Sequence, residues 1–117
     1  MARIDHVAFE SEDPDALARF YEEMFGARVV KSEGHPVMAY VGPTGFALHE
    51  TGGPGFHVAV RVSEEERAQL RQRLDEAGIG WEEHDHGVGV GLFFRDPEGR
   101  QLEAITYRGG GDPRRRE

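Results

Sequence analysis

The chain has 117 residues, of which 38% are hydrophobic and 31% are charged, a balance typical of one folded domain. It contains no cysteine, which excludes disulfides, thiolate metal ligands and thiol nucleophiles. The formal net charge of −8 argues against a nucleic-acid partner, because phosphate binding requires clustered cations. No apolar run approaches the ~20 residues of a membrane helix, and the acidic start is unlike a signal peptide. We therefore predict a cytoplasmic protein without a nucleic-acid or membrane partner.

The first half of the chain predicts the order strand, helix, strand, strand, strand. Residues 3–10 have the composition of a strand, and residues 11–26 predict a helix. Asp13 can cap the start of this helix, Pro14 suits its first turn, and Gly26 suits its exit. Three further strand-like runs, broken by glycine and proline, follow at 27–33, 36–42 and 45–50.

The second half repeats this order after a glycine-rich segment. Residues 56–62 predict a strand, and residues 63–78 predict a helix that begins with a capping box of Ser63 and Glu66. The final three strands are predicted at 79–85, 89–96 and 100–107.

The two halves also correspond in detail. His6 in "DHVAF" matches His57 in "FHVAV", and the turn "GPTG" at 42–45 matches "DPEG" at 96–99. We interpret the chain as a tandem duplication within one domain, about 1–108, with modules of about 3–51 and 55–107. In this register, four bulky residues form one set on equivalent strands: Met38, Tyr40, Leu92 and Phe94.

Alternation along the strands places both matched histidines on a ligand-binding face. Ile4, His6 and Ala8 share one face of the first strand, as His57 and Ala59 do in the second module. The bulkier residues occupy the opposite face, which is the natural one to pack against a helix. A polar ring beside a small residue suits a concave surface with room for a ligand.

The last strand of each module adds a second matched pair, His49 and Glu103. A change of register by one residue would turn Glu50 inward in place of His49. Imidazole and carboxylate ligands suit a divalent transition ion such as Zn, Ni, Mn, Co or Fe. A lone strand histidine is more often structural, but the matched placement in two modules favours a shared metal site formed by His6, His49, His57 and Glu103.

Two other polar segments receive weaker interpretations. His84 and His86 share a strand face by spacing, and mark either an exposed edge or the mouth of the cavity. Residues 109–117, which carry the basic run "RRR" at 114–116, predict a flexible, solvated tail without a catalytic role.

The motifs "IDHVAF", "ALARFYEEMFGARVV", "FHVAVRV" and above all "FFRDPEGRQLEAI" resemble those of the vicinal oxygen chelate (VOC) superfamily. This superfamily includes glyoxalase I, fosfomycin resistance enzymes, extradiol dioxygenases and bleomycin resistance proteins, and the resemblance covers about residues 3–107. It implies an α+β fold in which two tandem βαβββ modules form a curved, barrel-like mixed sheet around a cavity. It also implies a homodimer.

The resemblance implies a function as well. In metal-dependent members, the first and last strands of each module supply the ligands, which correspond here to His6, His49, His57 and Glu103. The first-module position is often Glu in glyoxalases, so His49 is a departure, although the other three residues supply a complete two-His-one-Glu set. The implied activity is that of a glyoxalase, lyase or isomerase that chelates neighbouring oxygens of a small metabolite, with Glu103 as ligand or general base. The alternatives are a metal-free protein that sequesters a drug or metabolite, a small Fe(II) extradiol-type dioxygenase, and a duplicated domain with a vestigial site.

Overall fold

Every predicted helix and strand is present in the computed structural model, which describes residues 2–109 and 111–115. None of the helices in these ranges is long and apolar enough to cross a membrane. The elements are β1 (Arg3–Ser11), α1 (Pro14–Phe25), β2 (Arg28–Val30), β3 (Val37–Val41), β4 (Thr44–Glu50), β5 (His57–Arg61), α2 (Glu64–Glu76), β6 (Trp81–Asp85), β7 (Gly89–Arg95), β8 (Gln101–Tyr107) and a 3-10 helix, η1 (Pro113–Arg115).

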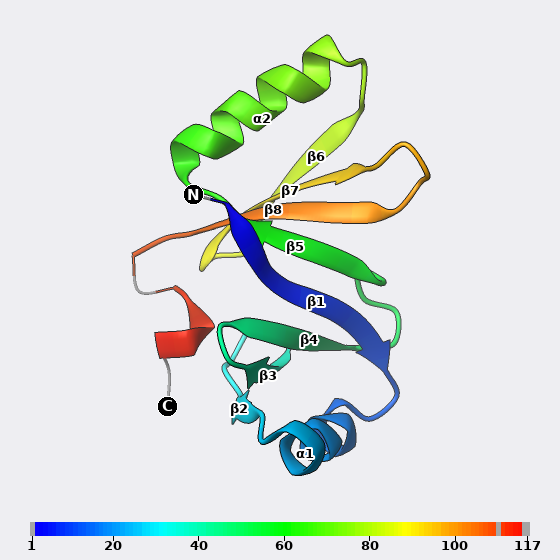
Figure 1. The fold of residues 1–117 in the computed structure, drawn as a ribbon, viewed down its shortest axis with the longest axis vertical. Coiled ribbons are helices and arrows are strands. Elements are labelled where there is room, and N and C mark those ends of the chain that lie inside the picture. The colour runs from blue at the N-terminus through cyan, green and yellow to red at the C-terminus, as the bar shows by residue number, and fades with distance from the viewer. Residues whose placement is uncertain (1, 110, 116–117) are drawn as a thin grey trace.

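The strands form one mixed sheet in the order β2-β3-β4-β1-β5-β8-β7-β6. In each module the first strand pairs in parallel with the last, and the two modules join through the antiparallel pair β1–β5. Figure 1 shows this junction in the middle of the molecule, with α1 and α2 at opposite ends. The mirrored strand order confirms the predicted α+β fold of two tandem βαβββ modules.

Both helices begin where their capping residues predict. Asp13 accepts a hydrogen bond from the Ala16 amide at 3.0 Å, and α1 ends at Gly26, whose φ of 68° is left-handed. In α2 the capping box is complete, because the Ser63 hydroxyl accepts from the Glu66 amide at 3.0 Å while the Glu66 carboxylate accepts from the Ser63 amide at 2.9 Å. These caps satisfy amides that would otherwise have no partner within the helix.

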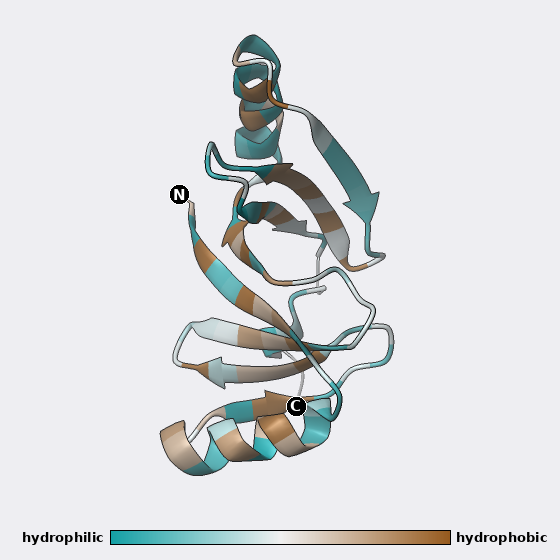
Figure 2. Cartoon of the chain, turned by 90° about the vertical axis from the view of Figure 1, so that its right-hand side faces the viewer, coloured by the Kyte–Doolittle hydropathy of each residue, from teal (hydrophilic) through white to brown (hydrophobic). Residues whose placement is uncertain are grey.

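The two helices pack differently on the sheet. On α1, Tyr21 stacks on Phe46 of β4 with ring centroids 4.5 Å apart. Three other apolar side chains of α1, Phe20, Met24 and Phe25, are between 51% and 61% exposed. Figure 2 shows apolar bands along α1, whereas α2 is largely hydrophilic. The outer surface of α1 is therefore unusually apolar for an exposed helix.

A β-bulge at the start of β1 changes which face of the sheet Ile4 occupies. Between Ile4 and His6 the register against β5 shifts by one residue, so that Asp5 is the extra residue of β1. Asp5 is completely buried, whereas Ile4 is 53% exposed and does not share the concave face with His6. The prediction for Ile4 is wrong because strict alternation holds only for an unbroken ladder.

The prediction that Met38, Tyr40, Leu92 and Phe94 form one set is wrong for the second module, because one turn there is longer. Met38 and Tyr40 do face the concave side, in a cluster with Ala8 and Ala47. Leu92 instead packs with Leu74 beneath α2, and Phe94 lies against that same cluster. The turn between β7 and β8 spans residues 96–100, but the turn between β3 and β4 spans only 42–43. The two turns differ in length by three residues, which is an odd number. Because side chains alternate between the two faces of a strand, an odd shift directs the opposite face of β7 toward the cavity.

The C-terminal segment also differs from its prediction. Asp112 is only 5% exposed, and the Arg114 side chain donates hydrogen bonds to Asp5 of β1 and to the carbonyl oxygen of Pro43 in the β3–β4 turn. Figure 1 shows η1, in red, beside one end of β4. The prediction of a solvated tail is therefore wrong for Asp112 and Arg114, because their charges pair with groups of the folded body. Residues 110, 116 and 117 of the predicted tail lie outside the described residues.

Candidate metal centre

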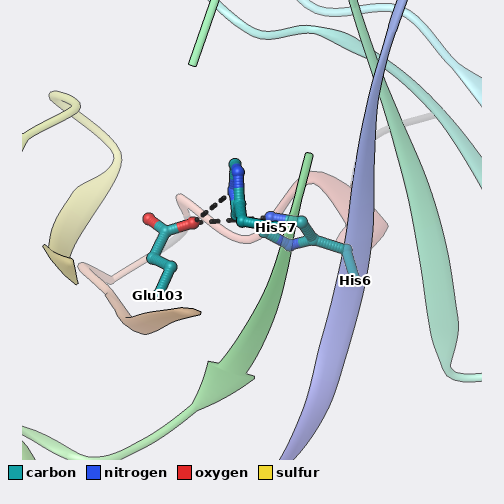
Figure 3. Close-up of side chains that lie close together, drawn as sticks. All are labelled: His6, His57 and Glu103. Carbon is teal, nitrogen blue, oxygen red and sulfur yellow. Dashed lines mark hydrogen bonds and ion pairs between the residues drawn. The ribbon is translucent and has the colours of Figure 1, made fainter. Parts of the chain in front are cut away.

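Three polar side chains from three neighbouring strands meet above a small residue. His6 of β1 lies opposite Ala59 of β5, and Ala59 lies opposite Glu103 of β8. Ala59 is fully buried, and its single methyl group leaves space for the longer side chains on either side. His57 shares this face two residues earlier on β5. Figure 3 shows both imidazoles directed toward the same oxygen of Glu103.

The spacing of these groups fits one metal ion. The Nε2 atoms of His57 and His6 lie 3.2 and 3.6 Å from Oε1 of Glu103. One ligand atom from each of the three residues lies within 4.8 Å of the others, and all three residues are buried. Two ligands that bind one ion at ~2.1 Å lie roughly 3 to 4 Å apart, so the two measured distances fit a shared ion.

The hydrogen bonds of both imidazoles favour metal binding through Nε2. The Nδ1 atom of His6 lies 2.7 Å from Oδ2 of Asp5, and that of His57 lies 3.1 Å from the carbonyl oxygen of Gly55. A carboxylate and a carbonyl only accept hydrogen bonds, so with an ion bound each ring would be neutral and carry its proton on Nδ1. The lone pair of each Nε2 atom would then face the ion, whereas without an ion a proton on Nε2 can be donated to Glu103. Metal-binding histidines characteristically have such partners.

A glycine makes room for the carboxylate. The second oxygen of Glu103, Oε2, accepts a hydrogen bond from Nε2 of His86 at 3.1 Å. A Cβ atom on Gly91 of β7 would overlap Oε2 of Glu103 and would lie 2.7 Å from the same nitrogen of His86. The only chemical signal of this role in the sequence is a glycine inside a strand, which often marks such a close approach.

The charges of the centre are coupled. Burial opposes a charge on His6, but hydrogen bonds to the Asp5 and Glu103 carboxylates outweigh it and raise the pKa of His6 to about 9. Burial likewise opposes the charge on Glu103, but hydrogen bonds from His57, His6 and His86 hold its pKa well below the usual range. In the metal-free protein at neutral pH, His6 is therefore an imidazolium paired with two carboxylates.

We expect the metal-free protein to lose stability as the pH rises from about 6.5 to about 9. The contribution of His6 is complete below its ordinary pKa of 6.5 and is lost as the pH rises through its folded-state pKa of about 9. The contribution of Glu103 is complete above its ordinary value of 4.5 and falls only in acid. Urea unfolding in the presence of a chelator measures the change. A His6→Asn variant should remove the loss, and an equal loss in that variant would contradict the role of His6.

The other predicted site residues lie outside the group of three. His49 faces the cavity from β4, but its ring centroid is 6.3 Å from that of His57, and it does not join the three clustered ligand atoms. Burial and the charges of His57 and His6 lower the pKa of His49. Glu50 is exposed at the cavity rim, so the alternative register of β4 is not adopted.

Of the two later histidines, only His86 reaches the centre. It lines the cavity and bonds Glu103, although its side chain is 40% exposed. His84 lies at the neighbouring open groove and pairs with Glu82 at 3.4 Å. The mouth-of-cavity interpretation therefore holds for His86, and the exposed-edge interpretation holds for His84.

A cavity of about 500 Å³ opens over the three clustered residues. This volume is within the usual range for small-molecule sites. Its walls are mainly apolar, and they include Val37, Met38, Val88, Phe93 and Ile105. The sequence prediction did not include Phe93, because it assumed turns of equal length in the two modules. The Phe93 ring lies edge-on to the His57 ring, with centroids 5.5 Å apart.

The chain matches a known family over most of its length. The model described as Glyoxalase-like domain matches residues 6–105. A curated protein, glutathione transferase FosA from Serratia marcescens, is 38% identical over 47 residues. That match covers 40% of this chain and 33% of the curated protein, so it spans only about a third of the relative's length.

Solved structures share the fold at low sequence identity. Methylmalonyl-CoA epimerase from Mycobacterium tuberculosis has a TM-score of 0.71 and 18% identity, covering 91% of this chain and 88% of its own. A glyoxalase/bleomycin resistance protein/dioxygenase superfamily member from Vibrio splendidus 12B01 has a TM-score of 0.65 and 16% identity, covering 91% and 99%. Catechol 2,3-dioxygenase has a TM-score of 0.67 and 18% identity, covering 90% and 40%. At these identities the likeness shows the fold alone.

Proposed function

Because the chain belongs to the glyoxalase-like domain family within the VOC superfamily, we propose that it is a divalent-metal-dependent enzyme of the glyoxalase, lyase or isomerase type. Its substrate in this proposal is a small oxygen-rich metabolite. The observation that carries the proposal is the buried set of His6, His57 and Glu103, in which both Nε2 atoms face one carboxylate oxygen. Two imidazoles and a carboxylate leave further coordination positions for substrate oxygens.

The residues around this set support acid–base chemistry. A divalent ion held there would act as a Lewis acid that stabilises negative charge on two neighbouring substrate oxygens. Glu103 would hold the ion with Oε1, while its Oε2 accepts a hydrogen bond from His86. His86 is half-exposed at the cavity mouth, so it is placed to pass a proton between Glu103 and a bound molecule or solvent. We assign His49 to the cavity wall and not to the ligand set, because the ligand atoms that cluster within 4.8 Å of one another belong to His6, His57 and Glu103.

The cavity lining supports an uncharged or cationic substrate with an apolar body. Among the described residues, no arginine or lysine lines the cavity, whereas Asp15, Glu50 and Glu103 do. An anionic substrate would meet carboxylates and no fixed cation apart from protonated histidine. The apolar walls would bury the rest of such a molecule, while its adjacent oxygens faced the centre.

Metal analysis of protein purified without a histidine tag tests the proposal. We expect about one equivalent of a divalent transition ion per chain after loading, bound tightly enough to need a strong chelator for removal. The loaded protein should then consume one of a panel of uncharged α-hydroxy carbonyl compounds, and chelation should stop the reaction. Failure to bind Zn, Ni, Mn, Co or Fe under any loading condition would reject the enzyme proposal.

Two other functions are distinguished by the same material. The acidic, cation-free lining also suits sequestration of a cationic drug or metabolite, as in the bleomycin-resistance branch implied by the resemblance. Tight binding of such a compound by protein that takes up no metal would favour that function. The two-His-one-carboxylate set also suits Fe(II), so oxygen uptake with a catechol tests a dioxygenase.

A homodimer is part of the proposal. The exposed apolar side chains Phe20, Met24 and Phe25 on α1 support it, because a second copy could bury them. The mass of the protein in solution, from light scattering, measures the assembly directly.

A further inference from the structure

The C-terminal segment reaches the metal centre through a single arginine. The guanidinium of Arg114 lies over the ring of Tyr40, with its central carbon 4.7 Å from the ring centroid. It donates to the carbonyl oxygen of Pro43 from Nε at 2.9 Å and from Nη2 at 2.6 Å. It also donates to Asp5 twice, from Nη1 to Oδ1 at 2.8 Å and from Nη2 to the backbone oxygen at 2.6 Å. This planar fork therefore joins the β3–β4 turn to the bulge of β1.

Asp5 is the group that these contacts hold in place. Its side chain is fully buried at the β-bulge, where an unpaired carboxylate would be strongly unfavourable. Oδ1 of Asp5 accepts a hydrogen bond from Arg114. Oδ2 accepts one from the Tyr107 hydroxyl at 2.7 Å and one from Nδ1 of His6 at 2.7 Å. The orientation of the His6 ring is thus connected to Arg114 through one carboxylate.

The segment that carries Arg114 is itself anchored. Asp112 accepts from the Arg61 side chain at 2.5 Å and from the backbone amide of Arg114 at 3.0 Å. The backbone oxygen of Arg114 accepts from the Arg28 side chain at 2.8 Å. The arginine is therefore held at its side chain by the β1 bulge and at its backbone by Arg28 of β2 and by Asp112, which Arg61 of β5 anchors.

We propose that Arg114 is a positioning residue of the metal centre, which acts through Asp5 to fix the Nε2 atom of His6 toward the site. The role in metal binding rests on the proposed function. Without the guanidinium, Oδ1 of Asp5 loses its cationic partner, and the carboxylate is held only through Oδ2, by Tyr107 and His6. The acceptor that sets the tautomer and the direction of the His6 ring is then less firmly held.

Cobalt titration followed by visible absorption tests the role in metal binding. Arg114→Ala should lower the affinity for Co²⁺ by about 10- to 100-fold and change the absorption of the bound ion, as expected for loss of a partner that orients a ligand. Arg114→Lys keeps the charge but loses the fork, so it should recover part of the affinity. Arg100→Ala is the matched control, since Arg100 is 66% exposed and its ion pairs among the described residues are with Asp96 and Glu98 of the "DPEG" turn. Wild-type affinity in Arg114→Ala would overturn the proposal.

A double-mutant cycle asks whether the effect runs through Asp5. In an Asp5→Asn background, Arg114→Ala should change the affinity by no more than about twofold, because the two residues act as one unit. An undiminished effect in this background would show that Arg114 does not act through Asp5, and would overturn the proposal.

A measurement without metal separates this proposal from the proposed function. The Nδ1 proton of His6 should give a downfield proton resonance in the wild type, assigned by its loss in His6→Asn. In Arg114→Ala that resonance should shift and exchange faster with water, whereas in Arg100→Ala it should not. If the wild type binds neither cobalt nor Zn, Ni, Mn or Fe, the proposed function fails while this resonance still decides the role of Arg114. An unchanged resonance in Arg114→Ala would overturn that role.

Discussion

Replacing Glu103 with glutamine is expected to lower the affinity for a divalent transition ion by about 100-fold or more, since each ligand contributes a large share of the total binding free energy. Oε1 of Glu103 is the atom that both imidazoles face, and the carboxylate is 4% exposed. Glutamine keeps the shape but removes the negative charge that offsets the ion. It also presents an amide group that cannot accept from His86 and bind the ion at the same time. Isothermal titration with zinc or manganese measures the loss.

The control for this substitution is Glu98→Gln on the "DPEG" turn. The Glu98 side chain is 75% exposed and pairs with Arg100 on the same turn, so the same chemical change there should leave the affinity as it is in the wild type. Equal affinity in Glu103→Gln and Glu98→Gln would show that the three clustered residues are not a metal site. The fold would stand, because it does not depend on this assignment.

Replacing Gly91 with alanine is expected to damage the centre without altering any ligand. The added Cβ would overlap Oε2 of Glu103 and lie 2.7 Å from Nε2 of His86. Glu103 cannot move freely, because His57 and His86 hold its two oxygens within a buried site. We expect a loss of about 1–3 kcal/mol in the free energy of unfolding from overpacking. Displacement of the carboxylate should also lower metal affinity by about 10- to 100-fold.

Gly80→Ala is the matched control for the glycine substitution. No atom lies within 4 Å of a Cβ built on Gly80, and its backbone is not in the left-handed region. The free energy of unfolding of this variant should be within about 1 kcal/mol of the wild-type value, and its metal affinity should be the same. Urea unfolding and metal titration on the two variants measure both quantities. If Gly91→Ala kept full stability and affinity, Glu103 would have room to relax, and its placement would not depend on the glycine.

Much of the fold could be predicted because it is locally encoded. The caps of both helices lie in short motifs, such as Ser63 with Glu66, whose hydrogen bonds join residues three apart. The matched turns and the repeated His-Val-Ala run reveal the duplication before any contact is known. Alternation then places His6, His57 and Glu103 on one face, which is where the structure has them. A pattern with period two is reliable as long as the ladder is regular.

The errors arise where regularity breaks. One extra residue at Asp5 changes which side chains of β1 face inward, and the longer β7–β8 turn brings Phe93 rather than Leu92 to the cavity. Periodicity carries no information on a bulge, and the length of a turn cannot be compared between modules until the strand ends are known. His86 was ambiguous for a related reason, since it follows the end of β6 and no alternation applies to it.

By itself, the sequence determined the class of fold, the duplication and the shared face of His6, His57 and Glu103, because these follow from capping motifs, strand alternation and repeated short motifs. Only the tertiary structure decided how that centre is supported. Asp5 and Arg114 are separated by 109 positions, yet they form one ion pair, and Gly91 contributes by lacking a side chain where Glu103 must fit. Both contacts join separate segments of the chain, so neither can be read from a local pattern. A charge is buried only where another segment of the chain supplies its partner.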